Sequence, residues 1–161
     1  MTDNLRHPAV DVIHGRISAS SFDPRGQLDD VTVRALMDDA VQAPSSFNIQ
    51  HWRFICVRDP ERKKRLRALA YGQRQVEDAA VTFVVLGDVR GHERLGEILE
   101  PSVERGVISQ STADSWVKQS DRIYADREMA RDEAIRSASL ASMNLMISAA
   151  TRPGLGAADR L

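Results

Sequence analysis

Ten consecutive residues, Ala43 to Trp52 (APSSFNIQHW), carry a high concentration of polar side chains. Hydroxyl and carboxamide groups of this kind can hydrogen-bond the heteroatoms of a flat heterocyclic ligand when they lie at the mouth of a sheet. The same residue types also cap helix ends and form turns, because their side chains bond free backbone groups. Taken alone, the segment therefore predicts either a capping turn, the commoner case, or a polar ligand site.

A second polar segment, His14 to Phe22 (HGRISASSF), offers one guanidinium, several hydroxyls and free backbone amides. Such a loop suits a phosphate group, because arginine presents a planar, permanently charged fork and serine hydroxyls can donate to the remaining oxygens. A solvated arginine in a serine-rich turn is the alternative explanation for this loop taken alone. Arg16 is therefore a candidate phosphate-binding residue.

Three other kinds of chemistry are not indicated. Cys56, the single cysteine, lies in an apolar run, which predicts a buried structural thiol and not a nucleophile. The four histidines lack the spacing of metal ligands, so no metal site is expected. The 22 basic and 23 acidic residues are mixed along the chain, and a net charge of -1 does not favour nucleic acid or anionic lipid as a partner.

Hydrophobic periodicity predicts the helices that position the two polar segments. A short helix, Ala9 to Gly15, precedes the arginine loop. An amphipathic helix capped by Asp29 and Asp30 follows it and ends near Ala43, because Pro44 disfavours helical geometry in the residue before it.

The remaining elements follow from apolar runs and from charged, leucine-bearing segments. A run without polar alternation, Ala80 to Leu86, predicts a strand covered on both faces. The last helix is apolar nearly all round, which predicts burial in the core or against a partner subunit. The expected elements are strands at 52–57 and 80–86 and helices at 61–71, around 93–100, around 113–124 and from about 126 to 150.

The length and composition indicate one globular domain. With 161 residues and 42% hydrophobic residues, the chain is long enough for one core, so a single domain over residues 1–161 is expected. The first residues carry no apolar signal core, and the longest apolar runs fall short of the roughly 20 residues that cross a bilayer. A cytoplasmic protein without a membrane segment is expected.

The order and spacing of the polar segments resemble a known family. An Arg-x-Ser loop ending in Phe-Asp, an amphipathic helix, Ala-Pro-Ser-Ser-x-Asn-x-Gln-x-Trp opening a strand, and Tyr-Gly-Gln-x-Gln-Val-x-Asp-Ala before a second strand are similar to the FMN-dependent nitroreductase family. The match continues from Leu140 to Met146 (LASMNLM), which looks like that family's central helix. The resemblance implies an α+β fold, with a central, mostly antiparallel sheet flanked by helices and a long buried dimer helix.

The resemblance also implies which residues bind FMN in the arginine loop. Arg16 and Ser18 match the family's loop, with Arg16 near the phosphate and ribityl end, and Ile17 and Ser20 belong to the same loop. Ser20 departs from the family, which usually carries Lys or Arg there. Part of the positive charge facing the flavin is therefore missing or supplied elsewhere.

A second group of residues matches the family segment that lies along the flavin ring. Where many relatives offer an asparagine to the pyrimidine edge this chain has Gly72, and Gln73 or Gln75 is suggested to compensate. His51 replaces a common proline. The matching residues are Pro44, Ser45, Ser46 and Asn48, with Gln50 beside them.

The resemblance further implies a redox activity in which the flavin carries the chemistry and no catalytic side chain is required. NAD(P)H would be the electron donor, and a nitroaromatic, a quinone or a flavin would be the small-molecule electron acceptor, in a homodimer. The chain ends soon after Gly154-Leu155-Gly156, where the family continues into further strands, so C-terminal strands are expected to be missing. The alternative is a remnant that lacks bound flavin and acts as a dimerising interaction module.

Overall fold

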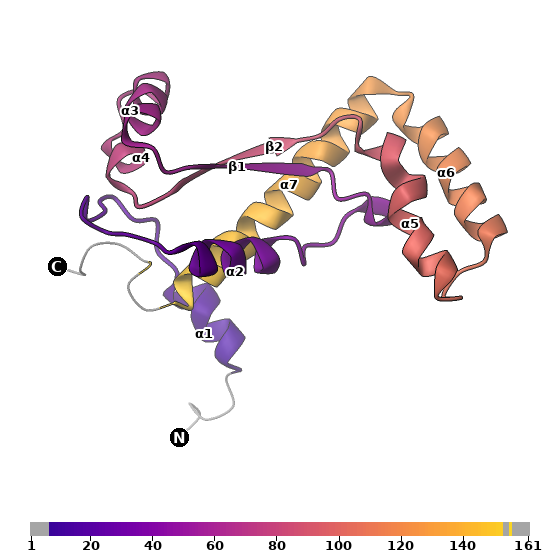
Figure 1. The fold of residues 1–161 in the computed structure, drawn as a ribbon, viewed down its shortest axis with the longest axis horizontal. Helices are drawn as coiled ribbons and strands as arrows, with labels where there is room; N and C mark the ends of the chain where they lie inside the picture. The colour runs from indigo at the N-terminus through magenta and orange to yellow at the C-terminus, as the bar shows by residue number, and fades with distance from the viewer. Residues whose placement is uncertain (1–6, 153–154, 156–161) are drawn as a thin grey trace. The chain divides into compact units, whose positions relative to one another are not determined.

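The computed structural model describes residues 7–152 and 155, which form two strands, seven α-helices and two short 3₁₀-helices (Figure 1). The strands expected at 52–57 and 80–86 and the helices expected from the sequence are present, whereas α4 was not predicted. The elements in chain order are α1 (Pro8–Gly15), α2 (Asp30–Ala40), η1 (Ser46–Asn48), β1 (Trp52–Val57), α3 (Pro60–Leu69), α4 (Arg74–Asp78), β2 (Thr82–Gly87), η2 (Gly91–Arg94), α5 (Leu95–Glu104), α6 (Gln110–Tyr124) and α7 (Arg127–Ala150).

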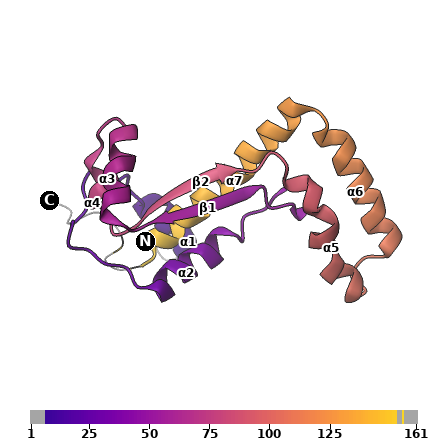
Figure 2. The ribbon, with the colours of Figure 1, turned by 45° about the horizontal axis from the view of Figure 1, so that its top comes forward.

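The strands β1 and β2 pair with each other in an antiparallel sheet (Figure 2). The amide of Asp88, just after β2, donates to the carbonyl of His51, just before β1, at 2.9 Å. The expectation that the second strand is covered on both faces is wrong, because residues 82–85 are half-buried and Leu86 and Gly87 are exposed. In the described part of the chain β2 has one neighbouring strand, which leaves its apolar run partly open.

Cys56 is exposed, so the prediction of a buried thiol is wrong. The residue lies near the end of β1, where Ile55 beside it is also exposed. Protein groups around the sulfur still desolvate it in part, and this raises the pKa of the thiol, while Arg58 acts in the opposite direction. Because a raised pKa keeps the thiol protonated at neutral pH, nothing in this environment activates Cys56 as a nucleophile.

The contacts within the chain divide it into two compact units, which are described separately. Unit 1 comprises Met1–Ala40, Ile55–Val84 and Met143–Leu161, and unit 2 comprises Val41–Phe54 and Val85–Ser142. The elements β1, β2 and α7 contribute residues to both units. The expectation of a single domain stays a prediction.

In unit 1, α3 packs on α4, and α2 lies beside the last turns of α7. The carboxylate of Asp29 accepts the amide of Thr32 at 2.7 Å, which confirms the expected cap of α2. The α3 helix starts in the same way, because the Asp59 carboxylate accepts the amide of Arg62. These caps satisfy backbone donors that a helix start leaves free.

In unit 2, α5 and α6 lie side by side (Figures 1 and 2) and close over an apolar cluster centred on Ile49 and Leu95, both 0% exposed. A second cluster joins Trp52 at the start of β1 to Ala138 and Ala141 of α7. The sheet approaches α7 closely at Gly87, where a Cβ atom would lie 2.9 Å from the backbone of Ala134.

The long helix α7 is buried along one side. Ala130, Ala134 and Ala141 are buried, whereas Ile135 and Leu140 are 57% and 41% exposed. The sequence predicted burial of this helix, and in the single chain one face of the helix is buried. No helix among the described residues, α7 included, combines the length and the apolar character that crossing a membrane requires.

Candidate functional site

The arginine loop borders an open pocket of about 480 Å³ in unit 1. Arg16, Ile17 and Ser18, three residues that the sequence predicted as a ligand site, contribute to its wall. Arg16 is the one charged residue among the described residues that line this pocket. The other lining residues come from the same loop, from the end of α7 and from beyond it: Gly15, Ala19, Phe22, Met146, Ala149, Ala150 and Leu155.

Arg16 carries a buried donor that lacks an acceptor. Its Nε atom is closed off from solvent and has no hydrogen-bond partner within the described part of the chain. An unpaired buried donor is unfavourable by about 1–3 kcal/mol, because it has lost water without gaining another acceptor. An anionic group that entered the pocket would meet the permanently charged guanidinium of Arg16 at its wall. The phosphate of a flavin nucleotide fits this residue.

The end of α7 that lines the pocket has part of its negative charge neutralised. The last carbonyls of a helix are free and carry partial negative charge, which is unfavourable for a nearby anion. Here the Thr151 hydroxyl and the Arg152 guanidinium both donate to the carbonyl of Ser148, at 2.7 Å and 2.8 Å. These bonds weaken the repulsion that a bound phosphate would meet.

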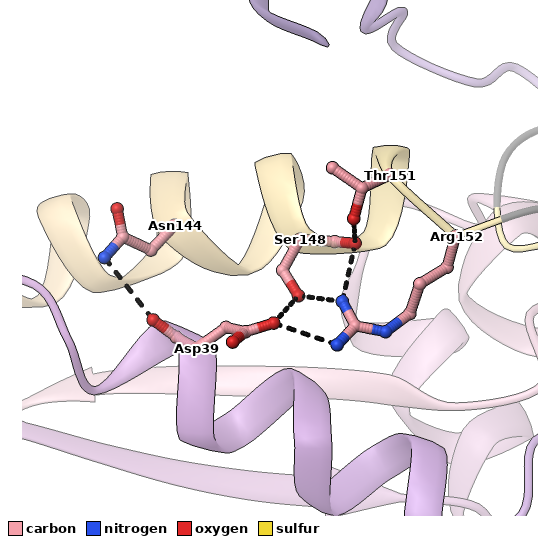
Figure 3. Close-up of polar contacts among 5 residues, drawn as sticks. All are labelled: Asp39, Asn144, Ser148, Thr151 and Arg152. Carbon is pink, nitrogen blue, oxygen red and sulfur yellow. Dashed lines mark hydrogen bonds and ion pairs between the residues drawn. The ribbon is translucent and has the colours of Figure 1, made fainter. Parts of the chain in front are cut away.

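A polar cluster fixes the last turns of α7 to α2, as Figure 3 shows. The Asp39 carboxylate accepts the Ser148 hydroxyl at 2.5 Å and pairs with the Arg152 guanidinium at 2.9 Å. The Asn144 amide donates to the Asp39 carbonyl at 3.5 Å. The Ser148 hydrogen bond, and after it the bond to Arg152, hold the pKa of Asp39 below its usual value. The cluster therefore anchors the helix end that borders the pocket.

The second predicted segment, from Ala43 to Trp52, lies in unit 2 and contains η1. Phe47, Asn48 and Gln50 have positive φ angles of 52°, 57° and 58°. A residue with a side chain in this left-handed region is unfavourable by about 1–3 kcal/mol, so such a run persists only where its surroundings hold it. Backbone strain of this kind gathers at ligand sites.

Hydrogen bonds and two buried anchors hold this strained turn. The Ser45 hydroxyl accepts the amide of Gln50 at 2.9 Å, and the Ser45 carbonyl accepts the amide of Asn48 at 3.1 Å. Ile49 and His51 are both 0% exposed, and His51 Nδ1 donates to the Asp88 carbonyl at 2.9 Å. The segment is thus an ordered turn, as one of the two interpretations of the sequence expected.

The sequence-predicted residues fall into two groups. Ser45, Ser46 and Gln50 are half-buried in the turn, and Pro44 and Asn48 beside them are exposed. This group belongs to unit 2, whereas the pocket residues belong to unit 1. That one flavin is bound by both groups stays a prediction.

Two further predicted residues, both in unit 1, lie outside the pocket wall. Ser20 is exposed and does not line the pocket, although it belongs to the arginine loop. Gln73 is exposed in unit 1 at the start of α4, and its side chain makes no capping hydrogen bond. Their part in binding stays a prediction. Among the described residues, no group of three or more His, Cys, Asp or Glu side chains could hold a metal ion.

Two buried side chains that contact the turn were not predicted. Tyr124 of α6 is 6% exposed and Glu133 of α7 is 8% exposed, and both interact with Ser46. A glutamate on the alanine-rich side of α7 is a signal that the sequence offered, because glutamate is rarely buried without a partner. The pocket residues Ala149 and Ala150 carry no chemical signature and gave no such signal.

Comparison with known proteins identifies the family. The family described as "Nitroreductase family" matches residues 13–158. The Bacillus subtilis (strain 168) protein "Putative NAD(P)H nitroreductase YodC" is 32% identical over 140 residues, which cover 87% of this chain and 69% of that protein.

Solved structures agree with this match. The crystal structure of the Bacillus subtilis "putative nitroreductase ydfN" is 32% identical, with a TM-score of 0.84 over 90% of this chain and 72% of that chain. An Exiguobacterium sibiricum 255-15 "putative nitroreductase in complex with FMN" is 27% identical, with a TM-score of 0.80 over 90% of this chain and 70% of that chain. The chain therefore belongs to the nitroreductase family of oxidoreductases.

Proposed function

We propose that this chain is an FMN-dependent oxidoreductase that uses NAD(P)H to reduce nitroaromatic compounds, quinones or related small-molecule acceptors. The observation that carries the proposal is the buried, unpartnered Nε of Arg16 at the wall of an open pocket. The names of the relatives add support, since one is named "Putative NAD(P)H nitroreductase YodC" and another was solved in complex with FMN.

Arg16 and Ser18 hold the phosphate end of FMN in this proposal. The guanidinium pairs with the phosphate oxygens, and the Ser18 hydroxyl donates to one that remains. A hydrogen bond to a charged group contributes about 1.5–3 kcal/mol, which corresponds to about 10- to 100-fold in affinity. Because Ser20 stands where the family resemblance implies a second basic residue, this chain depends more strongly on Arg16.

The strained turn of unit 2 holds the ring in this proposal. Its hydroxyl and carboxamide groups are the kind that bond ring heteroatoms, and a fixed turn pays little conformational entropy when a ligand binds. Bound FMN supplies the redox chemistry, which passes electrons from NAD(P)H to the acceptor. The residues assigned to the ring are Pro44, Ser45, Ser46, Asn48, Gln50 and, at the pyrimidine edge, Gln73.

The proposal includes a homodimer that forms through α7. Met129, Ile135 and Leu140 are between 41% and 57% exposed in the single chain, although they are large apolar residues on the longest described helix. Exposed apolar surface of this kind marks interaction sites, and twofold dimers are the commonest closed assemblies.

The flavin content of the purified protein tests the proposal. We expect the protein to be yellow, to release one FMN per chain on denaturation, and to oxidise NAD(P)H when a quinone is added. The Arg16→Ala variant should retain less FMN than the wild type. A wild-type protein that neither carries flavin nor binds it on titration would contradict the proposal and would favour a dimerising module without cofactor.

A further inference from the structure

Ser46 is held from two sides by residues far away in the sequence. Tyr124, at the end of α6, interacts with the Ser46 side chain. The Glu133 carboxylate, from α7, accepts the Ser46 amide at 3.4 Å. All three residues belong to unit 2. Ser46 is also the first residue of η1, directly before the strained residues Phe47 and Asn48.

The Tyr124 ring is itself fixed between two imidazoles. The ring centroids of His51 and His92 lie 5.3 Å and 5.4 Å from that of Tyr124. Burial raises the pKa of Tyr124 and outweighs the Ser46 hydrogen bond, which lowers it. The hydroxyl therefore stays protonated at neutral pH.

Glu133 is held just as firmly. One of its oxygens accepts the Ser137 hydroxyl at 2.7 Å, and the other pairs with Arg136. Its bond from the Ser46 amide, at 3.4 Å, is longer than the usual range of roughly 2.7–3.2 Å. This bond is therefore a weak one.

We propose that Tyr124 and Glu133 are positioning residues that hold the turn from Ser46 to Gln50 in its strained conformation before any ligand binds. Loss of a contact to Ser46 should loosen the three left-handed residues of this turn, because the strained form then depends on the remaining anchors, Ser45, Ile49 and His51. A relaxed turn must be ordered again on binding, and this lowers affinity. The consequence for FMN rests on the proposed function, whereas the state of the turn does not.

Two conservative variants and two matched controls test the proposal. Tyr124→Phe removes one hydroxyl and keeps the ring between the histidines, and Glu133→Gln removes the charge. The controls are Tyr71→Phe, at the one other tyrosine, which is 98% exposed, and Glu128→Gln, an exposed glutamate in the first turn of α7. Each protein is studied by amide hydrogen exchange without flavin and by FMN titration.

Tyr124→Phe should speed exchange of the Ser46 and Gln50 amides and raise the Kd for FMN, each by about 2- to 10-fold, as expected for one lost hydrogen bond. Glu133→Gln should act in the same direction with a smaller effect. The amides around Leu99 in α5 should exchange at the wild-type rate in both variants, and both controls should match the wild type throughout.

Each outcome separates the positioning role from the proposed function. If wild type binds FMN and Tyr124→Phe changes neither exchange nor Kd, the positioning role is wrong and the proposed function stands. If wild type binds no FMN but the turn exchanges faster in Tyr124→Phe, the proposed function fails and the positioning role stands. Faster exchange spread evenly over the turn and α5 would mean a general loss of stability and would overturn the positioning role.

Discussion

Neutralising Asp39 should destabilise the protein by about 1–2 kcal/mol at neutral pH. Asp39→Asn keeps an oxygen that can accept the Ser148 hydroxyl, but it removes the charge that strengthens this bond and attracts Arg152. The Asp39 and Arg152 side chains are 50% and 28% exposed, so water screens the ion pair and its share is below about 1 kcal/mol. The charge-assisted bond from the buried Ser148 hydroxyl supplies the rest.

The loss should depend on pH in one direction. The pKa of Asp39 is lower in the folded protein than in the unfolded chain, so its carboxylate stabilises the fold fully above the unfolded pKa of about 3.9. That contribution disappears as the pH falls through the folded pKa. The wild type should therefore be more stable than Asp39→Asn at pH 7, and the difference should shrink below about pH 4.

Thermal unfolding followed by circular dichroism measures the effect. For a chain of this size, 1–2 kcal/mol corresponds to a fall in Tm of about 2–8 °C. Glu100→Gln, at an exposed carboxylate in the middle of α5, is the control and should leave Tm unchanged. A fall in Tm that is as large at pH 3 as at pH 7, or no fall at either pH, would show that the cluster does not act through the Asp39 charge.

Three further results are expected. Gly87→Ala should lower the free energy of unfolding by about 1–3 kcal/mol, because the added Cβ would meet the Ala134 backbone at 2.9 Å. In the control Gly96→Ala the added Cβ meets nothing within 4 Å, so the stability should be unchanged or slightly higher. Urea unfolding measures both variants, and equal effects would contradict the close approach at Gly87. Ile135→Glu should convert the proposed dimer into a monomer in sedimentation analysis, and an unchanged sedimentation coefficient would exclude this part of α7 from the proposed interface. Cys56 should react with a thiol reagent in the folded protein, faster as the pH rises towards its raised pKa, and a thiol that reacts only after denaturation would contradict its exposure.

Much of the fold could be predicted because local chemistry decides it. Asp29 caps α2, and the chain leaves the helix before Pro44, for reasons that need no tertiary structure. The five-residue α4 was missed because so short a helix has no periodicity to detect. The burial of β2 and Cys56 was misjudged because an apolar run does not say which of its faces a neighbour covers.

In the candidate site, too, local sequence predicted some residues, whereas others depend on tertiary packing. Arg16 was predicted because its loop resembles that of a known family in type and spacing, and the structure places Arg16 in a pocket wall with its buried Nε unpartnered. The positions of Tyr124 and Glu133 depend on how α6 and α7 pack against a turn about 80 residues earlier, which local patterns do not reveal. The alanines at the end of α7 line the pocket, but an alanine side chain carries no sequence signal for such a role.

The proposed phosphate site at Arg16 is tested most directly with FMN and with riboflavin, which lacks the phosphate. The affinity for each is measured in the wild type and in Arg16→Ala. The wild type should bind FMN about 10- to 100-fold more tightly than riboflavin, because Arg16 offers the phosphate a buried, charged donor. In Arg16→Ala the two affinities should become similar. A wild type without preference for FMN, or a variant that keeps the full preference, would contradict the assignment of this pocket to the phosphate.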